Sequence, residues 1–391
     1  MAQTILTANV RQAMREVKAF EREGDYRPAA RQAIKEVLEG TMRAATSEHL
    51  EAMASAGVPD RRNGSYDRHV LTEIGDVTVA VARTRTYSAN EVLVRYRRRS
   101  ASVNQAILDC FVLGASTRKV GRILRPLLGE TVSAATVSQV AKRLDELVAA
   151  YHQRPLTRRY RFLLFDGVVL KRKSGAGAQK RVVLVALGIT PEGRKEVIDF
   201  LVAQGESQSA WEEFLHDLYC RGLSGEGVEL IVTDGGTGLL AALPLVYPRV
   251  PVQRCWAHKT RNVTAKVREK DRAAVKQAVH RISHAPNERG AQKALADFAR
   301  EWATAYPAAV ACLTKDAESL LAFYRIKEPG RWKEIRTTNA IERRFVEVRR
   351  RTRPMGVFAD RTSMERILYA VFTYENQKEG TNAPLLLTQN S

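Results

Sequence analysis

Two aspartate-glycine pairs each follow a short apolar segment of the chain. Asp166-Gly167 comes after residues 162–165, and Asp234-Gly235 comes after residues 228–233. Carboxylates at the ends of neighbouring strands can share a metal ion, because paired strands lie about 4.8 Å apart. A single aspartate at such a place is more often an ordinary turn or helix cap. It is therefore the pair that indicates metal-dependent chemistry.

The apolar pattern around the two aspartates predicts an α/β core. We expect strands at 162–165, 182–189, 196–203, 228–234 and 250–255, and helices at 208–221 and 238–243. The first three strands predict an antiparallel meander, and a right-handed crossover then places the fourth strand parallel to the first. Asp166 and Asp234 are therefore expected at the same edge of neighbouring strands.

The region before the core has features typical of DNA binding. Residues 4–56 have helical periodicity with a break near 24–28, and the alternation of Val77, Val79 and Val81 with Thr78 and Ala80 predicts a strand pair. Between residues 83 and 99 a single acid, Glu91, stands against six arginines, which favours phosphate contact over a merely solvated strand. These arginines are Arg83, Arg85, Arg95, Arg97, Arg98 and Arg99.

Residues 117–150 predict a helix-turn-helix. One helix is expected over 117–125, then a turn containing Pro126 and Gly129, and then a helix from Ser133, its cap, to about Ala150. Any two short amphipathic helices give a similar pattern, so an ordinary helical pair is the alternative. Gln139, Lys142 and Arg143 are side-chain types suited to major-groove contact.

Longer motifs resemble the Mutator-type insertion-sequence transposases of bacteria. The resemblance runs from about Ser116 to Tyr374, and Gly236 and Ala359 depart from the pattern. The motifs are Asp166-Gly167, Gly205-Glu206-Ser207, Asp234-Gly235, QRCWAH at 253–258, RTTNAIE at 336–342 and TRPMG at 352–356. The resemblance implies a DDE transposase with an α/β RNase H-like core, interrupted by a mostly helical insertion. It also implies a homo-oligomer, with a dimer on paired DNA ends.

The motifs and periodicity together give an expected division of the chain. The parts are an N-terminal helical region (1–60), a basic β segment (61–100), a helix-turn-helix-like DNA-binding domain (101–155), the first part of the RNase H-like core (156–258), the helical insertion (259–332), the final helices of the core (333–375) and a tail (376–391).

Glu342 is the expected third carboxylate, beside Asp166 and Asp234. Glu334 precedes the cap signal at 337–339, so it should lie outside the helix expected over 339–350. Glu347 lies roughly 140° around that helix from Glu342 and among arginines, as an ion-pair partner. Three such carboxylates can hold two metal ions that activate water or a 3′-hydroxyl and stabilise the leaving oxygen. Oxygen ligands suit Mg²⁺, for which we expect Mn²⁺ to substitute.

Basic residues are dense around Glu342. Residues 331–366 hold 11 lysines or arginines against five acids, which favours contact with the DNA backbone over a solvated helix face. The DNA contacts expected in and near the core are Arg254, His258, Arg336, Asn339, Arg343, Arg349, Arg350 and Arg353.

Cys255 and His258 have a spacing that could also bind zinc, together with His280 and His284. The stretch between the two pairs has no zinc-finger pattern, however. The family resemblance places the first pair beside the core as a structural or DNA-end element. We therefore do not expect zinc.

The overall charge agrees with a polyanionic partner. Lys plus Arg outnumber Asp plus Glu by 63 to 43, giving a formal charge of +20, so we expect DNA, both element ends and target, as the partner. No apolar run approaches the roughly 18 residues needed to span a bilayer, and the N-terminus lacks a signal-peptide pattern. We expect a cytoplasmic, nucleoid-associated protein without a membrane partner.

Two other functions fit much of this pattern. One is a DNA-binding regulator with an inactive RNase H-like domain, whose signature would be a missing carboxylate. The other is an RNase H-like nuclease or junction resolvase, which cuts without joining. Joining of a 3′ end to new DNA distinguishes a transposase from both.

Overall fold

The computed structural model describes residues 27–72, 74–95, 101–112, 115, 117–128, 132–174, 177–352 and 360–381. The chain divides into two compact units, residues 1–143 with 386–391, and residues 144–385. The helix expected before residue 24, Arg97 to Arg99 and Arg353 lie outside the described residues. No helix in the described ranges is long and apolar enough to cross a membrane.

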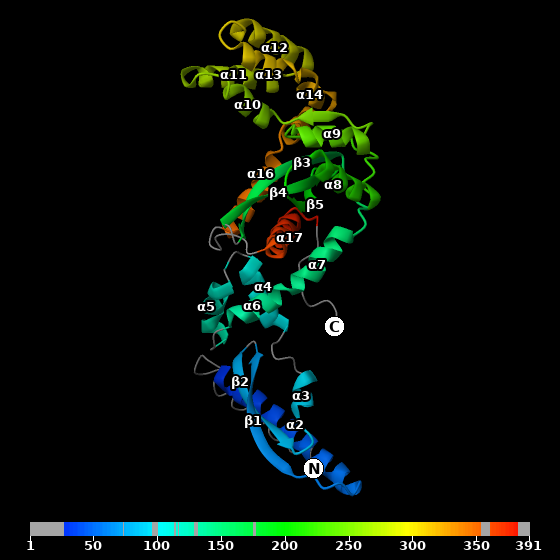
Figure 1. The fold of residues 1–391 in the computed structure, drawn as a ribbon, viewed down its shortest axis with the longest axis vertical. Coiled ribbons are helices and arrows are strands. Elements are labelled where there is room, and N and C mark those ends of the chain that lie inside the picture. Colours follow the sequence, from blue (N-terminus) through cyan, green and yellow to red (C-terminus); the bar gives the residue numbers. More distant parts are fainter. Residues whose placement is uncertain are drawn as a thin grey trace. The chain divides into compact units, whose positions relative to one another are not determined.

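The first unit contains a hairpin of two strands packed against a long helix (Figure 1). Val77, Val79 and Val81 are at most 3% exposed and pack with Leu38 and Met42. The predicted strand pair and helical stripe are confirmed, since alternate strand residues share one face. The elements are α2 (Arg27–Ser55), β1 (Arg62–Thr72), β2 (Gly75–Thr84), α3 (Asn90–Arg95), α4 (Ala101–Val112), α5 (Thr117–Leu128) and α6 (Ala134–Ala141).

The expected helix-turn-helix differs from the structure in two ways. Pro126 lies inside α5 rather than in a turn. The single helix expected over 133–150 is two helices, α6 and α7 (Arg143–Gln153), which separate at Lys142. Ser133 does cap α6, since its hydroxyl accepts a hydrogen bond from the Thr136 backbone N–H at 3.1 Å.

The segment expected to be a basic β region is also partly helical. Residues 90–95 form α3, because Leu93 turns into the core of the hairpin and is buried there. Arg95 therefore ends a helix instead of lying on a strand face.

The second unit is built on a mixed sheet in the order β5-β4-β3-β6-β7. β3 pairs antiparallel with β4 and β4 with β5, whereas β3–β6 and β6–β7 are parallel. The expected meander and the parallel fourth strand are confirmed, so the unit has a mixed α/β core. The strands are β3 (Phe162–Ser174), β4 (Gly177–Ile189), β5 (Lys195–Ala203), β6 (Leu230–Thr233) and β7 (Val252–Arg254).

β3 runs further than the sequence indicated. It continues through Asp166 to Ser174 in a long hairpin with β4. Beyond Asp166 only one face of the strand is covered, so Val168 and Leu170 are buried while Val169 is about half exposed. Asp166 is thus an interior position of a strand, not its end.

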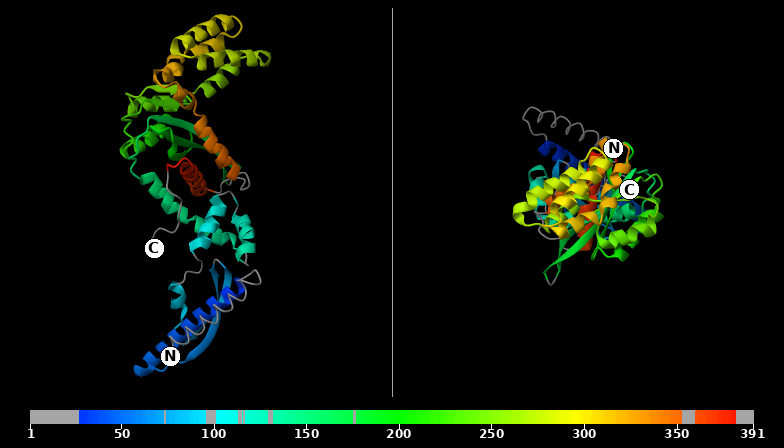
Figure 2. Two further views of the ribbon diagram at one scale, coloured as in Figure 1. Left: turned by 180° about the vertical axis from the view of Figure 1, so that it is seen from behind. Right: turned by 90° about the horizontal axis from the view of Figure 1, so that it is seen from above.

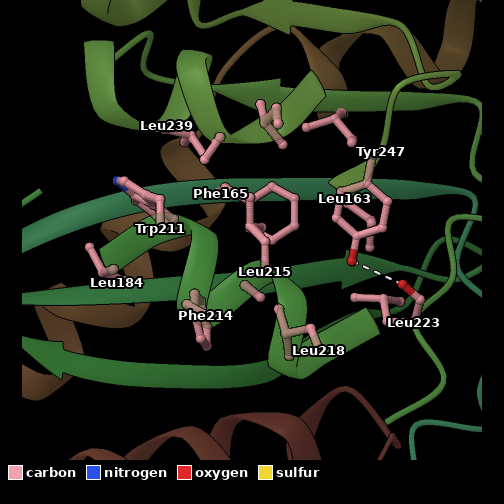
Figure 3. Packing of buried hydrophobic residues seen from close by; sticks show 14 of the residues in the cluster. Leu163, Phe165, Leu184, Trp211, Phe214, Leu215, Leu218, Leu223, Leu239 and Tyr247 are labelled. Atoms are coloured by element: carbon pink, nitrogen blue, oxygen red, sulfur yellow. Dashed lines mark hydrogen bonds between the residues drawn. The ribbon is translucent and has the colours of Figure 1, made fainter. Parts of the chain in front are cut away.

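Helices cover both faces of the sheet. On one face α8 (Gln208–Cys220) and α9 (Thr237–Val246) bury Trp211, Phe214 and Leu239 around Phe165 (Figure 3). On the other, α16 (Asn339–Thr352) and α17 (Arg361–Lys378) lie side by side (Figure 2). There the Phe372 ring lies 5.6 Å from Phe345 and 5.5 Å from Phe200.

The chain between β7 and α16 is mostly helical. Residues 266–323 are mostly helical, with short 3-10 turns between the helices. The helices of this stretch and its flanks are α10 (Trp256–Thr264), α11 (Arg272–Ser283), α12 (Glu288–Trp302), α13 (Pro307–Thr314), α14 (Ala317–Leu321) and α15 (Trp332–Ile335).

α7 belongs with the second unit from Leu144 onward, earlier in the chain than the boundary at 155 drawn from the sequence. Arg366 of α17 donates two hydrogen bonds to Asp145, at 2.5 and 2.6 Å. Tyr151 donates to the Val197 carbonyl of β5 at 2.8 Å. These contacts explain why the helix separates from α6 at Lys142.

Candidate active site

Asp166 and Asp234 lie on neighbouring parallel strands. The last matched pair of β3 and β6 is Phe165 with Thr233, and each aspartate is the next residue of the chain. The expected adjacency of the two aspartates is therefore confirmed, although β3 continues beyond Asp166 while β6 ends at Thr233. Gly235 follows with a φ of 88°, a conformation that glycine adopts without strain, so the chain can turn directly after Asp234.

Asp166 is held in an unfavourable environment for a carboxylate. It is 2% exposed, and its Oδ2 atom is buried without a hydrogen-bond partner among the described residues. Burial, followed by the negative charge of Asp234, raises the pKa of Asp166 to about 7, with a smaller contribution from Glu342. A buried oxygen of this kind is ready to bind a cation.

Glu342 reaches this neighbourhood from the first turn of α16. Ile341 and Phe345 are fully buried and fix the helix on the sheet, as expected from their spacing. The Glu342 side chain is 40% exposed, and its Oε1 atom lies 3.4 Å from Arg261 and 3.9 Å from His258. Glu347 is instead an ion-pair partner of Arg350 and Arg351, at 2.9 and 2.6 Å.

The three carboxylates share one electrostatic neighbourhood without forming a closed ligand shell. Within the part of the chain that the structure describes, no three histidine, cysteine, aspartate or glutamate side chains are grouped closely enough to hold a metal ion. Glu342 faces two cationic partners at long distances. The donor set, all hard oxygens around an unpartnered Asp166 oxygen, nevertheless suits Mg²⁺ or Mn²⁺.

Cys255 ties the Asp234 strand to the start of α16. Its N–H donates to the Thr233 carbonyl at 2.7 Å, and its sulfur lies 3.3 Å from the Thr338 backbone nitrogen. The next residue, Trp256, donates its N–H to the Arg336 carbonyl at 2.9 Å. Cys255 is 1% exposed, so its role in this arrangement is to fix two site elements relative to each other.

His258 is, with Arg261, one of the cationic groups that face Glu342. Its interaction with Cys255, followed by the negative charges of Asp166 and Asp234, raises its pKa to about 9. Burial acts in the opposite direction but is outweighed. The imidazole is therefore positively charged at neutral pH and lies beside the three carboxylates.

Glu206 is an additional carboxylate that the sequence reasoning did not assign to the site. It follows β5 and precedes α8, and burial, followed by the charge of Asp234, raises its pKa. The sequence carried a signal for it. Gly205-Glu206-Ser207 is one of the motifs quoted above, and β5 runs in the same direction as β3, so the segment that follows β5 leaves the sheet on the side to which Asp166 and Gly167 lead.

Comparison with known proteins decides the family of the chain. The family described as "Transposase, Mutator family" matches residues 2–380. The chain belongs to the Mutator family of transposases. It is 32% identical to the transposase for insertion sequence element IS905 of Lactococcus lactis, covering 90% of this chain and 92% of that protein.

Two further relatives of this Mutator-family chain have similar coverage. The transposase for insertion sequence element ISRM5 of Rhizobium meliloti is 32% identical over 89% of this chain and 88% of its own length. The transposase for IS256 in transposon Tn4001 of Staphylococcus aureus is 30% identical over 83% and 84%. The similarity therefore includes both units of the chain.

The residues expected to contact DNA fall into two groups in this family member. Most of those with described side chains are exposed, which leaves them accessible to a ligand. On α6, α7 and the turn between them these are Gln139, Lys142 and Arg143, and on α16 they are Asn339, Arg343, Arg349 and Arg350.

Arg254 and Arg336 form the second group, because both make contacts inside the protein. Arg254 pairs with Asp316 at 2.9 Å and donates to the Gly235 carbonyl at 3.0 Å. Arg336 donates to the Ser283 carbonyl at 2.7 Å, and burial lowers its pKa. In this arrangement Arg254 supports the turn after Asp234, a role that the sequence motif did not reveal.

Proposed function

We propose that this transposase cuts DNA at the terminal inverted repeats of an insertion sequence and joins the resulting 3′ end to target DNA. Asp166, Asp234 and Glu342 are the proposed metal ligands and catalytic residues, on an RNase H-like core. The observation that carries the proposal is the position of Asp166 and Asp234, which both come one residue after the last matched pair of β3 and β6. Asp166 also has a buried oxygen without a hydrogen-bond partner among the described residues.

The order of elements supports the RNase H-like assignment. Three antiparallel strands precede a helix and a fourth strand parallel to the first, and α16 returns after an insertion of helices. This topology places Asp166 beside Asp234, and the charge of Glu342 acts on Asp166. Metal-dependent phosphoryl transfer requires such convergent carboxylates.

Two steps account for cutting and joining. In the first, water attacks the phosphorus at the element end, a P–OH bond forms, and the P–O3′ bond breaks to release a 3′-hydroxyl. In the second, that hydroxyl attacks a target phosphodiester, and a target 3′-hydroxyl leaves. Bound divalent ions would supply a Lewis acid for the attacking and leaving oxygens. No covalent intermediate with the protein is needed.

The protein's own groups have separate tasks in this scheme. The carboxylates would hold the divalent cations and so orient the attacking oxygen. His258, which is cationic at neutral pH, is suited to contact a DNA phosphate beside them. Exposed Arg343, Arg349 and Arg350 on α16 extend a basic surface from the site along which the DNA backbone can lie.

The test replaces each carboxylate by its amide. Asp166→Asn, Asp234→Asn and Glu342→Gln should abolish Mg²⁺-dependent cleavage and strand transfer on a terminal-repeat substrate while end binding persists. Glu347→Gln, on the same helix but directed to Arg350 and Arg351, is the matched control and should retain activity. Robust cleavage by Glu342→Gln, or complete loss in a folded Glu347→Gln protein, would show that the third ligand is misplaced.

A further inference from the structure

Glu206 occupies a space that two glycines leave open. A β-carbon on Gly167, the neighbour of Asp166, would collide with the Glu206 carboxylate, and one on Gly238 would collide with the Glu206 backbone carbonyl. The segment between β5 and α8 can therefore lie directly against the turn after Asp234. Since both glycines lack a side chain, the Glu206 carboxylate reaches the two aspartate-bearing strands.

The position of Gly236 shows how close the carboxylates are. A β-carbon there would lie 3.5 and 3.7 Å from the two carboxylate oxygens of Asp234 and 3.6 Å from Glu206 Oε2. The carboxylates of Asp234 and Glu206 thus both lie within 3.7 Å of one point. Like charges so arranged repel each other in the absence of a cation.

The surroundings of Glu206 offer it no stable cationic partner at contact distance among the described residues. No hydrogen bond or ion pair of its carboxylate lies within the usual limits, although the charge of His258 acts on it from further away. Asp166, next to Gly167 on β3, has a buried oxygen without a hydrogen-bond partner. Glu206 and Asp166, whose pKa values are both raised by the charge of Asp234, therefore both lack an ion-pair contact among the described residues.

We infer that Glu206 is a fourth carboxylate of the metal site and shares a divalent cation with Asp234. The inference rests on the proposed function, because it takes Asp166, Asp234 and Glu342 as the other ligands. The ligand class is a hard divalent cation, Mg²⁺ or Mn²⁺, which prefers carboxylate oxygens. Glu206 touches the cation in this arrangement and so belongs to the catalytic residues.

Direct measurement of metal binding tests the inference without depending on activity. Mn²⁺ affinity of the full chain is measured by calorimetry in the absence of DNA, for the wild type and for Glu206→Gln. We expect the affinity to fall about 10- to 100-fold, the range seen when groups that organise a metal site are removed. Glu213→Gln, exposed on the adjoining helix α8, is the matched control and should bind Mn²⁺ like the wild type.

A second variant separates a ligand from a merely structural residue. Glu206→Asp keeps the charge but shortens its reach, so it should bind Mn²⁺ with intermediate affinity. Its cleavage should recover as the Mn²⁺ concentration is raised. A structural role would instead lower the melting temperature of the metal-free Glu206→Gln protein while leaving Mn²⁺ affinity unchanged.

Asp234→Asn distinguishes failure of this inference from failure of the proposed function. If Glu206→Gln binds Mn²⁺ like the wild type while Asp234→Asn does not, Glu206 is not a ligand and the three-carboxylate site stands. Wild-type Mn²⁺ affinity in both variants would remove the proposed metal site altogether. Loss of affinity in both, with Glu213→Gln unaffected, is the result we expect.

Discussion

Burying the carboxylate of Asp166 lowers the stability of the folded protein, and the proposed role of this residue as a metal ligand explains why it is buried. Burial and the charge of Asp234 raise the pKa of Asp166 from its ordinary value of 3.8 to about 7. The ionised form of Asp166 is therefore disfavoured in the folded protein. A cation at the site would remove this cost, because it would neutralise the charge that burial penalises. Folding and metal binding should therefore be coupled through this single residue.

Asp166→Asn should stabilise the metal-free protein at alkaline pH. The folded-state pKa lies above the unfolded one, so the wild type loses stability as pH rises from about 4 through 7, and the amide variant does not. The expected gain at pH 8 is on the order of 3 kcal/mol and should be smaller at pH 5. Denaturant melts in EDTA measure it.

Mg²⁺ provides the internal control for that comparison. Saturating metal should stabilise the wild type at pH 8 more than it stabilises Asp166→Asn, because the amide variant has lost one of the proposed carboxylate ligands. If the amide variant is no more stable than the wild type in EDTA at pH 8, the burial cost attributed to Asp166 is wrong.

For individual residues, the sequence predicted the adjacency of the two aspartates but not the side chains that surround them. Asp166, Asp234 and Glu342 followed from apolar strands, helix phase and family motifs, and the strand adjacency is confirmed by the register. Glu206 was missed because its approach depends on the missing side chains of Gly167 and Gly238, which lie on other elements. The inward direction of Arg254 likewise depends on Asp316, far along the chain.

At the level of elements, a small network of polar side chains joins the helices between β7 and α16 to the sheet. Asp316, just before α14, pairs with Arg254 of β7 and with Lys259 of α10. Gln253 completes the attachment, because its side chain donates to the Leu320 carbonyl at 2.9 Å and accepts from the Phe323 N–H at 2.8 Å. The network also supports Arg254 over the turn after Asp234.

Asp316→Ala should destabilise the protein by about 3 kcal/mol or more, because it leaves two buried cations without a counter-charge. The Lys259 side chain is only 5% exposed, so solvent cannot compensate. Chemical denaturation monitored by tryptophan fluorescence measures the change. Glu301→Ala removes one partner of an exposed pair with Arg281 and should cost less than about 1 kcal/mol. Equal effects of the two substitutions would contradict the network's role.

The limits of sequence periodicity are clearest at α6 and α7. Both helices have the same apolar spacing, so the sequence predicted one helix across Lys142. The break exists because Val137 and Val140 bury themselves with α4 and α5, whereas Tyr151 and His152 contact β5. Local propensity carries no information about which of two cores a helix face will join.

The whole molecule has an excess of 20 positive charges and divides into two compact units. We therefore expect that the first unit can bind DNA without the second unit, which carries the proposed catalytic residues. The first unit has a core of its own around β2, and it presents exposed Gln139, Lys142 and Arg143 near its end. Composition predicted a polyanionic partner. The division at residue 143 could not be read from it, because basic residues occur throughout the chain.

Residues 1–143 should bind terminal-repeat DNA without the catalytic unit, and a fragment ending there avoids exposing the face of α7 that packs on β5. The affinity should fall as salt is raised, with a log-log slope of about −0.9 per phosphate neutralised.

In the full chain, Lys142→Ala should make this slope shallower by about 1 if Lys142 binds a phosphate. Lys293→Ala, an exposed lysine on α12, is the matched control and should leave the slope unchanged. Because electrostatic contact and base recognition contribute separately, the slope should be similar on unrelated DNA while the affinity is lower. Salt-independent binding, or equal affinity for repeat and unrelated DNA, would mean that recognition of the element ends does not reside in this unit.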